Sequence, residues 1–220
     1  RVIEIFKVGL PAALEQVIFQ IGITAFLILV AYYGTEAYAA YGIGVQILSF
    51  SFVIGFGFSI AGATLVGQHL GAQNKDQAKR AGWGAMRLSI ISMTFFGIII
   101  VTFAEPLARF MIDNDEVVRL TVIFIWLLGS MQPLMAIEFS LGGALRGAGD
   151  TKTPLVITLT CLLFIRVFLA IVFFLLDASI EIIFSTLLAD YIVKGFLYVS
   201  RFKSDRWMNV LKIKEVDQQL

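Results

Sequence analysis

Long stretches without charged residues constrain this chain more than any other feature of its sequence. Residues 37–68 contain no Asp, Glu, Lys or Arg. An α-helix needs roughly 20 apolar residues to cross the hydrocarbon core of a bilayer, so this run is more than long enough. Charged residues make up only 15% of the chain, whereas soluble domains carry about a quarter. The sequence therefore predicts an integral membrane protein.

Six segments have the length and apolar character of membrane-spanning helices. The last is the weakest, because Asp190 and Lys194 interrupt it. Pro133 lies inside the fourth and is expected to kink it. We predict an all-α membrane protein with a six-helix transmembrane bundle over residues 1–201 and a basic cytoplasmic tail over residues 202–220. The expected spans are 8–33, 38–68, 86–104, 119–145, 154–176 and 181–201.

The distribution of Lys and Arg predicts the orientation of these spans. Of the 17 basic residues, 13 fall on one side, two on the other and two within spans. Basic residues mark the cytoplasmic side of membrane proteins, so we expect a multi-pass protein of the cell membrane with both ends of this chain in the cytoplasm. The basic side holds Arg1, Lys7, Lys75, Lys79, Arg80, Arg87, Arg146, Lys152, Arg201, Lys203, Arg206, Lys212 and Lys214, and the other side holds Arg109 and Arg119.

Composition also excludes several kinds of site. The single cysteine, Cys161, cannot form a disulfide within the chain. One cysteine and one histidine cannot build a zinc or iron–sulfur centre. The sequence contains no phosphate-loop motif and no recognisable nucleophile set. We therefore expect neither an enzyme nor a bound cofactor, and no nucleic-acid partner.

Two glycine-rich motifs lie at the predicted cytoplasmic ends of spans. They read VGQHLGAQN at residues 66–74 and GALRGAGDTKTP at residues 143–154. The first resembles the loop between helices eight and nine of multidrug and toxic compound extrusion (MATE) transporters, and the second resembles the loop between helices ten and eleven. The two motifs occur in the right order and on the same predicted side, and the resemblance extends from Gly9 to about Arg201.

This resemblance implies the C-terminal six-helix lobe of a twelve-helix transporter. It implies secondary antiport, in which inward flow of H⁺ or Na⁺ drives export of a cationic or amphipathic compound. The implied partners are the N-terminal six-helix lobe of the same protein, these small molecules and the lipid bilayer.

Four ionisable residues fall inside predicted spans, namely Glu15, Glu138, Arg166 and Asp190. Charges at this depth are costly, and they usually face the interior of the bundle or a wet cavity. The four residues lie on four spans at overlapping depths. They therefore predict one polar cluster that takes part in ion or substrate binding.

Glu15 borders a polar stripe on the first span. Gln16, Gln20 and Thr24 recur at every fourth position and share one helical face. Glu15 is therefore a candidate carboxylate for H⁺ or Na⁺, with Gln16 and Gln20 beside it. The alternative is a structural ion pair between Glu15 and Arg166.

The other two acids leave similar alternatives open. Glu138 either binds the cation or pairs with Arg166 and ties two spans together. Asp190 has Lys194 four residues further along the same helix, which favours a local ion pair. Arg166 is expected to be a counter-ion, because an unpaired arginine would be costly at this depth.

Two other functions fit the charges of the spans less well than drug export does. A flippase for lipid-linked oligosaccharides would need several basic residues in its cavity to hold pyrophosphate. The spans instead contain three acids against two basic residues. A membrane scaffold or receptor would need no charges inside the membrane, so the buried charges disfavour it.

The orientation can be tested by thiol labelling in intact cells. In a variant lacking Cys161, cysteines placed at Asp115 and Ser179 should react with an impermeant reagent. Cysteines placed at Lys75 and Lys152 should react only after the membrane is permeabilised. The reverse pattern would overturn the predicted orientation.

Overall fold

The computed structural model describes residues 2–209 and the side chains of residues 9–208. Within 2–209 every element is a helix and no strand occurs, which confirms the predicted all-α fold. The last part of the expected tail, residues 210–220, lies outside this range. The elements are α1 (Val2–Ala31), α2 (Thr35–Gly71), α3 (Lys75–Thr102), α4 (Ala104–Met111), α5 (Asp115–Ser130), α6 (Gln132–Gly147), α7 (Lys152–Thr160), the π-helix η1 (Cys161–Val167), α8 (Phe168–Leu175), α9 (Ile180–Lys203) and the 3₁₀-helix η2 (Arg206–Asn209).

The helices have the lengths of membrane spans. In the described part of the chain, α1, α2, α3, the continuous run α7–η1–α8 and α9 are each long and apolar enough to cross a bilayer. A sixth span consists of α5 and α6, which are bent by 53° at a break. Pro133 lies in the first turn of α6, where its missing N–H is tolerated and a new helix can begin. The expected kink is confirmed, and the chain is a multi-pass membrane protein.

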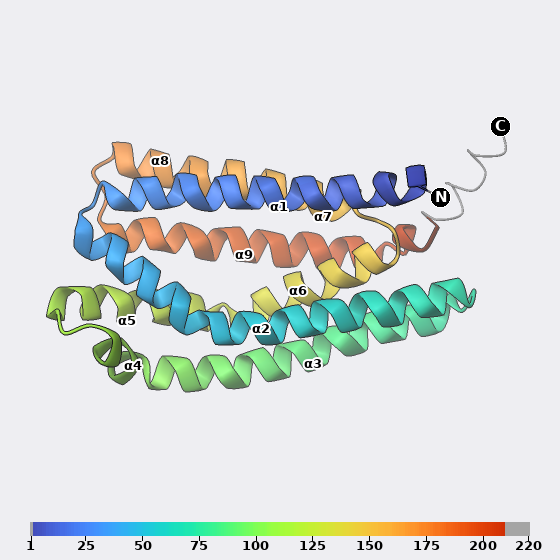
Figure 1. Ribbon diagram of the computed structural model, residues 1–220, viewed down its shortest axis with the longest axis horizontal. Coiled ribbons are helices and arrows are strands. Elements are labelled where there is room, and N and C mark those ends of the chain that lie inside the picture. Colours follow the sequence, from blue (N-terminus) through green and yellow to red (C-terminus); the bar gives the residue numbers. More distant parts are fainter. Residues whose placement is uncertain (1, 210–220) are drawn as a thin grey trace.

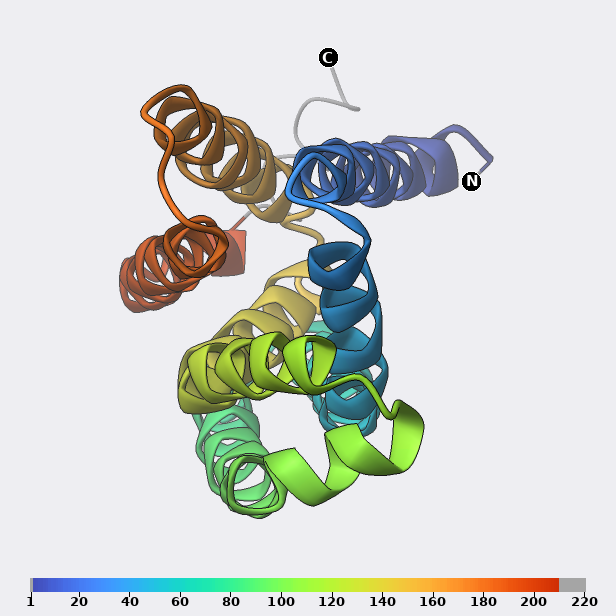
Figure 2. The same cartoon turned by 90° about the vertical axis from the view of Figure 1, so that its left-hand side faces the viewer.

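The helices pack in two groups (Figures 1 and 2). One group contains α2, α3, α5 and α6, and the other contains α1, α7–η1–α8 and α9. Contacts of α6 and α5 with α9 join the groups. The α2–α3 turn, the α6–α7 loop and both described ends of the chain lie at one end of the bundle, which we call the basic end. The α1–α2 and α8–α9 turns and α4 lie at the opposite, acidic end.

The two basic residues at the acidic end are neutralised locally. Arg109 contacts Glu105 through Nε at 2.9 Å, and Arg119 contacts Glu116 through Nη2 at 2.8 Å. These pairs leave no excess of positive charge at the acidic end.

Glycines bring α2 and α6 into backbone contact. A Cβ on Gly143 would overlap the backbone of Ser59, and one on Gly147 would overlap the backbone of Ala63. A Cβ on Gly67 would lie 3.1 Å from the Gly147 carbonyl oxygen. Small residues permit this close approach of helices in membranes. The two motifs of the sequence analysis therefore touch each other at the basic end.

The first residues of the expected tail fold back onto the bundle. The Trp207 side chain is fully buried and stacks on Phe202, with ring centroids 4.5 Å apart. Its Nε1–H donates to the Phe202 carbonyl oxygen at 2.9 Å. Lys79 on α3 forms an ion pair with Asp205 at 2.7 Å. Residues 202–209 are thereby tied to α3 and α9.

Candidate functional site

Three charged side chains meet between α6 and α9, deep in the bundle. The Nζ of Lys194 lies 3.3 Å from a carboxylate oxygen of Glu138 and 3.2 Å from one of Asp190. The Lys194 and Asp190 side chains are almost completely buried, whereas Glu138 keeps 20% of its side chain exposed. One ammonium group therefore holds two carboxylates, and Glu138 is the member that can be reached from outside the lobe.

Close packing of α6 against α9 makes this contact possible. Asp190 and Lys194 lie four residues apart, on the same face of α9. A Cβ on Gly195 would come within 3.2 Å of Leu134, so glycine at this position lets the two helices approach. The expected local pair of Asp190 with Lys194 is confirmed, and Glu138 joins the same ammonium from the facing helix.

Arg166 lies near this cluster without an ion pair in the described part of the chain. It belongs to the π-helix η1, and 5% of it is exposed. Its guanidinium carbon lies 5.6 Å from the ring centroid of Phe26, a cation–π distance. It is close enough to Asp190 for a Coulombic interaction. The alternatives that paired Arg166 with Glu15 or with Glu138 are wrong.

Glu15 has a different partner, Arg146. The Nη2 of Arg146 donates to one carboxylate oxygen at 2.7 Å and Nε donates to the other at 3.2 Å. The Thr158 hydroxyl adds a third hydrogen bond at 3.2 Å. Glu15 therefore ties α1 to the last turn of α6 and to α7. The prediction that all four ionisable residues form one cluster is therefore wrong, because Glu15 lies in a separate ion pair with Arg146.

Tyr198 lies between these two groups. It is fully buried on α9 and within Coulombic range of Glu138, Glu15 and Arg146. Among the described residues its hydroxyl has no hydrogen-bond partner. The two carboxylate oxygens of Asp190 likewise make no well-aligned hydrogen bond, although Lys194 is close. Buried polar atoms without a partner are rare in folded proteins, and an ordered water or ion between them is one explanation.

The polar stripe of α1 points away from this interior. Gln16, Gln20 and Thr24 are exposed, whereas their neighbour Glu15 is buried. The Thr24 hydroxyl donates to the Gln20 carbonyl oxygen at 2.9 Å. The structure therefore separates Gln16 and Gln20 from the carboxylate that they were expected to accompany.

The glycine-rich loop between α6 and α7 is organised by Asp150. Its carboxylate accepts hydrogen bonds from the Thr153 hydroxyl at 2.8 Å and from Arg201 Nη2 on α9 at 2.6 Å. Gly149 has φ = 79°, a conformation that favours glycine. The second motif is therefore a joint between α6, α7 and α9. No group of three or more His, Cys, Asp or Glu side chains suited to a metal ion occurs among the residues searched, 2–209.

Sequence reasoning missed two partners of the buried acids. The sequence places Arg146 outside the membrane and indicates no acidic partner for it, yet its long side chain reaches back to Glu15. Thr158 gave no signal in the sequence. Lys194 was expected to pair with Asp190, but its contact with Glu138 depends on how α6 and α9 face each other.

Charged side chains are thus buried between apolar helices, close to a bend in one span and a π-helix in another. Residues 11–172 match the family described as MatE. A "Probable multidrug resistance protein NorM" of Thermotoga maritima is 35% identical over 213 residues, which cover 93% of this chain and 44% of that protein. The chain belongs to the MatE family.

Solved structures show the same fold. The "MATE transporter ClbM in complex with Rb+" superposes with a TM-score of 0.86 at 20% identity, over 94% of this chain and 49% of that one. A MOP superfamily transporter from Pyrococcus furiosus gives a TM-score of 0.82 at 19% identity, over 89% of this chain and 43% of that one. The chain thus spans less than half the length of the proteins it resembles.

The Glu15–Arg146 pair should contribute mainly to stability. Glu15→Gln leaves the Arg146 guanidinium with a weaker partner. It should therefore destabilise the full-length protein by about 1–3 kcal/mol, less than a fully buried pair would because Arg146 is 35% exposed. Thermal melting measures this loss, and Glu36→Gln, at an exposed carboxylate, is the control.

A charge exchange separates this structural role from a role in coupling. Glu15→Arg combined with Arg146→Glu should recover part of the lost melting temperature. A Glu15→Gln protein with normal melting behaviour and no export would instead assign Glu15 to the coupling reaction.

Proposed function

We propose that this chain is one lobe of a secondary antiporter that exports cationic or amphipathic compounds in exchange for H⁺ or Na⁺. The observation that carries this proposal is the Glu138–Lys194–Asp190 cluster between α6 and α9. The family of the chain and the names of its relatives as multidrug resistance proteins support it. Because the chain spans less than half of those relatives, the second lobe would come from the rest of the protein.

Glu138 is the proposed coupling carboxylate. When Glu138 is ionised, Lys194 forms ion pairs with Glu138 on α6 and with Asp190 on α9. When Glu138 is neutralised, only the ion pair with Asp190 on the same helix remains. Two unit charges at this separation attract by on the order of 4 kcal/mol at an effective dielectric constant of 20. A shift of about 5.5 kcal/mol reverses a two-state equilibrium from 1:99 to 99:1. Loss of this attraction is therefore large enough to alter how α6 and α9 pack.

The geometry favours a proton over a sodium ion. The Lys194 ammonium already lies within 3.3 Å of both carboxylates, where a metal ion would experience its repulsion. A proton instead binds one oxygen of Glu138 and leaves the ammonium in place. The charges in this interior balance, because Glu138 and Asp190 face Lys194 and Arg166. A proton added to Glu138 therefore gives the interior a net positive charge, and the proton is released in the transport state that binds it less tightly.

The exposed face of α1 is the proposed contact with the second lobe or with the transport cavity. Gln16, Gln20 and Thr24 lie on that face within a membrane span. Polar side chains at this depth are unfavourable against lipid and are usually found against protein or water. Compounds moving through the cavity would then pass the same glutamines.

Neither alternative function gains support from the interior charges. The described part of the lobe presents no excess of basic groups near Glu138 to hold a pyrophosphate, as a lipid-linked oligosaccharide flippase would require. A scaffold would not need the buried Lys194 and its two carboxylates, which cost desolvation energy.

Export driven by an ion gradient tests the role of Glu138. In membrane vesicles containing the full-length transporter, Glu138→Gln should reduce pH-driven efflux of a cationic dye to the background of vesicles without transporter. The amide keeps the shape of the side chain but cannot exchange a proton. Asp113→Asn, at an exposed residue, is the control and should keep the normal rate.

Repeating the assay with a sodium gradient identifies the ion. The account predicts that the pH gradient drives export and that sodium alone does not. Sodium-driven export lost in Glu138→Gln would assign the site to Na⁺, and normal export by Glu138→Gln would remove Glu138 from the mechanism.

A further inference from the structure

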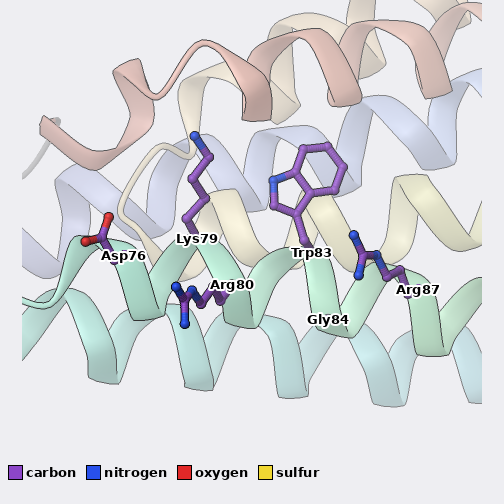
Figure 3. Close-up of a pocket in the computed structure, with 6 residues that line it drawn as sticks. All are labelled: Asp76, Lys79, Arg80, Trp83, Gly84 and Arg87. Carbon is purple, nitrogen blue, oxygen red and sulfur yellow. The ribbon is translucent and has the colours of Figure 1, made fainter.

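A basic hollow lies on α3 near the basic end of the bundle (Figure 3). Its volume is about 540 Å³. The residues that line it recur at helical spacing, so they share one face of a single helix. They are Asp76, Lys79, Arg80, Trp83, Gly84 and Arg87.

The depth of this hollow follows from the sequence of α3. Residues 88–102 of α3 contain no charged residue, and at 1.5 Å per residue this run is about 22 Å long, most of the thickness of the hydrocarbon core. Arg87 therefore marks the boundary of the hydrocarbon. Arg80 lies about 10 Å further out along the helix, across the layer of lipid headgroups. Trp83 lies between them, at the level where tryptophan is enriched in membrane proteins.

Two arginines in the hollow have no acidic partner in the described part of the chain. Lys79 is held by Asp205 at 2.7 Å, whereas Arg80 and Arg87 are exposed and form no ion pair with a described carboxylate. Asp76 is the single acid of the lining, against three basic residues. Because Asp205 neutralises Lys79, the two arginines and Asp76 leave the hollow a net charge of +1.

The position between the two arginines is open. A Cβ placed on Gly84 would meet no atom within 4 Å, so no side chain separates Arg80 from Arg87. Each guanidinium presents paired N–H donors in the geometry that matches phosphate oxygens. The hollow therefore has the size, charge and depth of a receptor for a phosphate group of the adjoining lipid leaflet.

We propose that this hollow binds the headgroup of an anionic phospholipid. Arg87 and Arg80 bind the phosphate oxygens, Trp83 packs against the glycerol region, and the acyl chains lie along the apolar surface of α3 beyond Leu88. Basic pockets next to membrane helices recognise anionic headgroups in this way. The site is separate from the Glu138 cluster and requires no transport step.

Lipid titration of the purified full-length transporter tests the proposal. The protein is delipidated in a non-ionic detergent, and its melting temperature is followed as dioleoyl phosphatidylglycerol or dioleoyl phosphatidylcholine is added. Only phosphatidylglycerol should stabilise the wild type. Arg80→Gln with Arg87→Gln should weaken its apparent affinity by roughly 30-fold, the effect of two basic groups near an anionic lipid.

A matched variant controls for charge. Lys152→Gln with Lys203→Gln removes the same charge from exposed positions at the same end, and it should leave the phosphatidylglycerol affinity unchanged. Gly84→Leu fills the hollow without changing charge, and it should weaken binding even if the arginine variant folds poorly.

Three outcomes would overturn the proposal. Equal losses in the arginine and lysine variants would reveal only diffuse attraction to the basic end. Normal affinity in Gly84→Leu would exclude the hollow itself. Equal stabilisation by glycerol phosphate at matched concentration would identify a site for free anions instead of a lipid.

Discussion

The burial of a lysine between two carboxylates is the interaction on which the interior of this lobe depends. An ammonium group cannot remain charged in an apolar bundle without partners, and Lys194 obtains them from α9 through Asp190 and from α6 through Glu138. This requirement fixes the rotation of both helices. The break before Pro133 and the absence of a side chain at Gly195 let α6 meet it. The proposed function is a consequence of the same contact, because neutralising Glu138 removes one of its two anchors.

At the basic end, the helices are held together by close backbone contacts and by hydrogen bonds of two carboxylates. Backbone contact between α2 and α6 at Gly143 and Gly147 leaves no room for rearrangement at that crossing. Asp150 joins the following loop to α9, and Glu15 joins α1 to Arg146. The motifs that resemble MATE transporters are thus explained by packing and hydrogen bonds, and the Glu138–Lys194–Asp190 cluster lies apart from them, between α6 and α9.

The sequence predicted the helices well, because span length and charge are local properties of the chain. The kink at Pro133 and the pair of Asp190 with Lys194 were likewise local, and both were confirmed. The partners of Glu15 and Glu138 could not be predicted in the same way. They depend on how helices rotate about their axes and on the reach of Arg146, neither of which hydrophobic pattern determines. The rotation of α1 about its axis also directs Gln16 and Gln20 outward, which the hydrophobic pattern does not predict.

Infrared difference spectroscopy of the full-length transporter tests the central claim most directly, because it detects the protonation of a single buried carboxyl group. We predict that lowering the pH produces a protonated carboxyl C=O band in the wild type and that this band is absent from Glu138→Gln. The Asp113→Asn control should retain it. A band that persists unchanged in Glu138→Gln would contradict the assignment of Glu138 as the group that exchanges the proton.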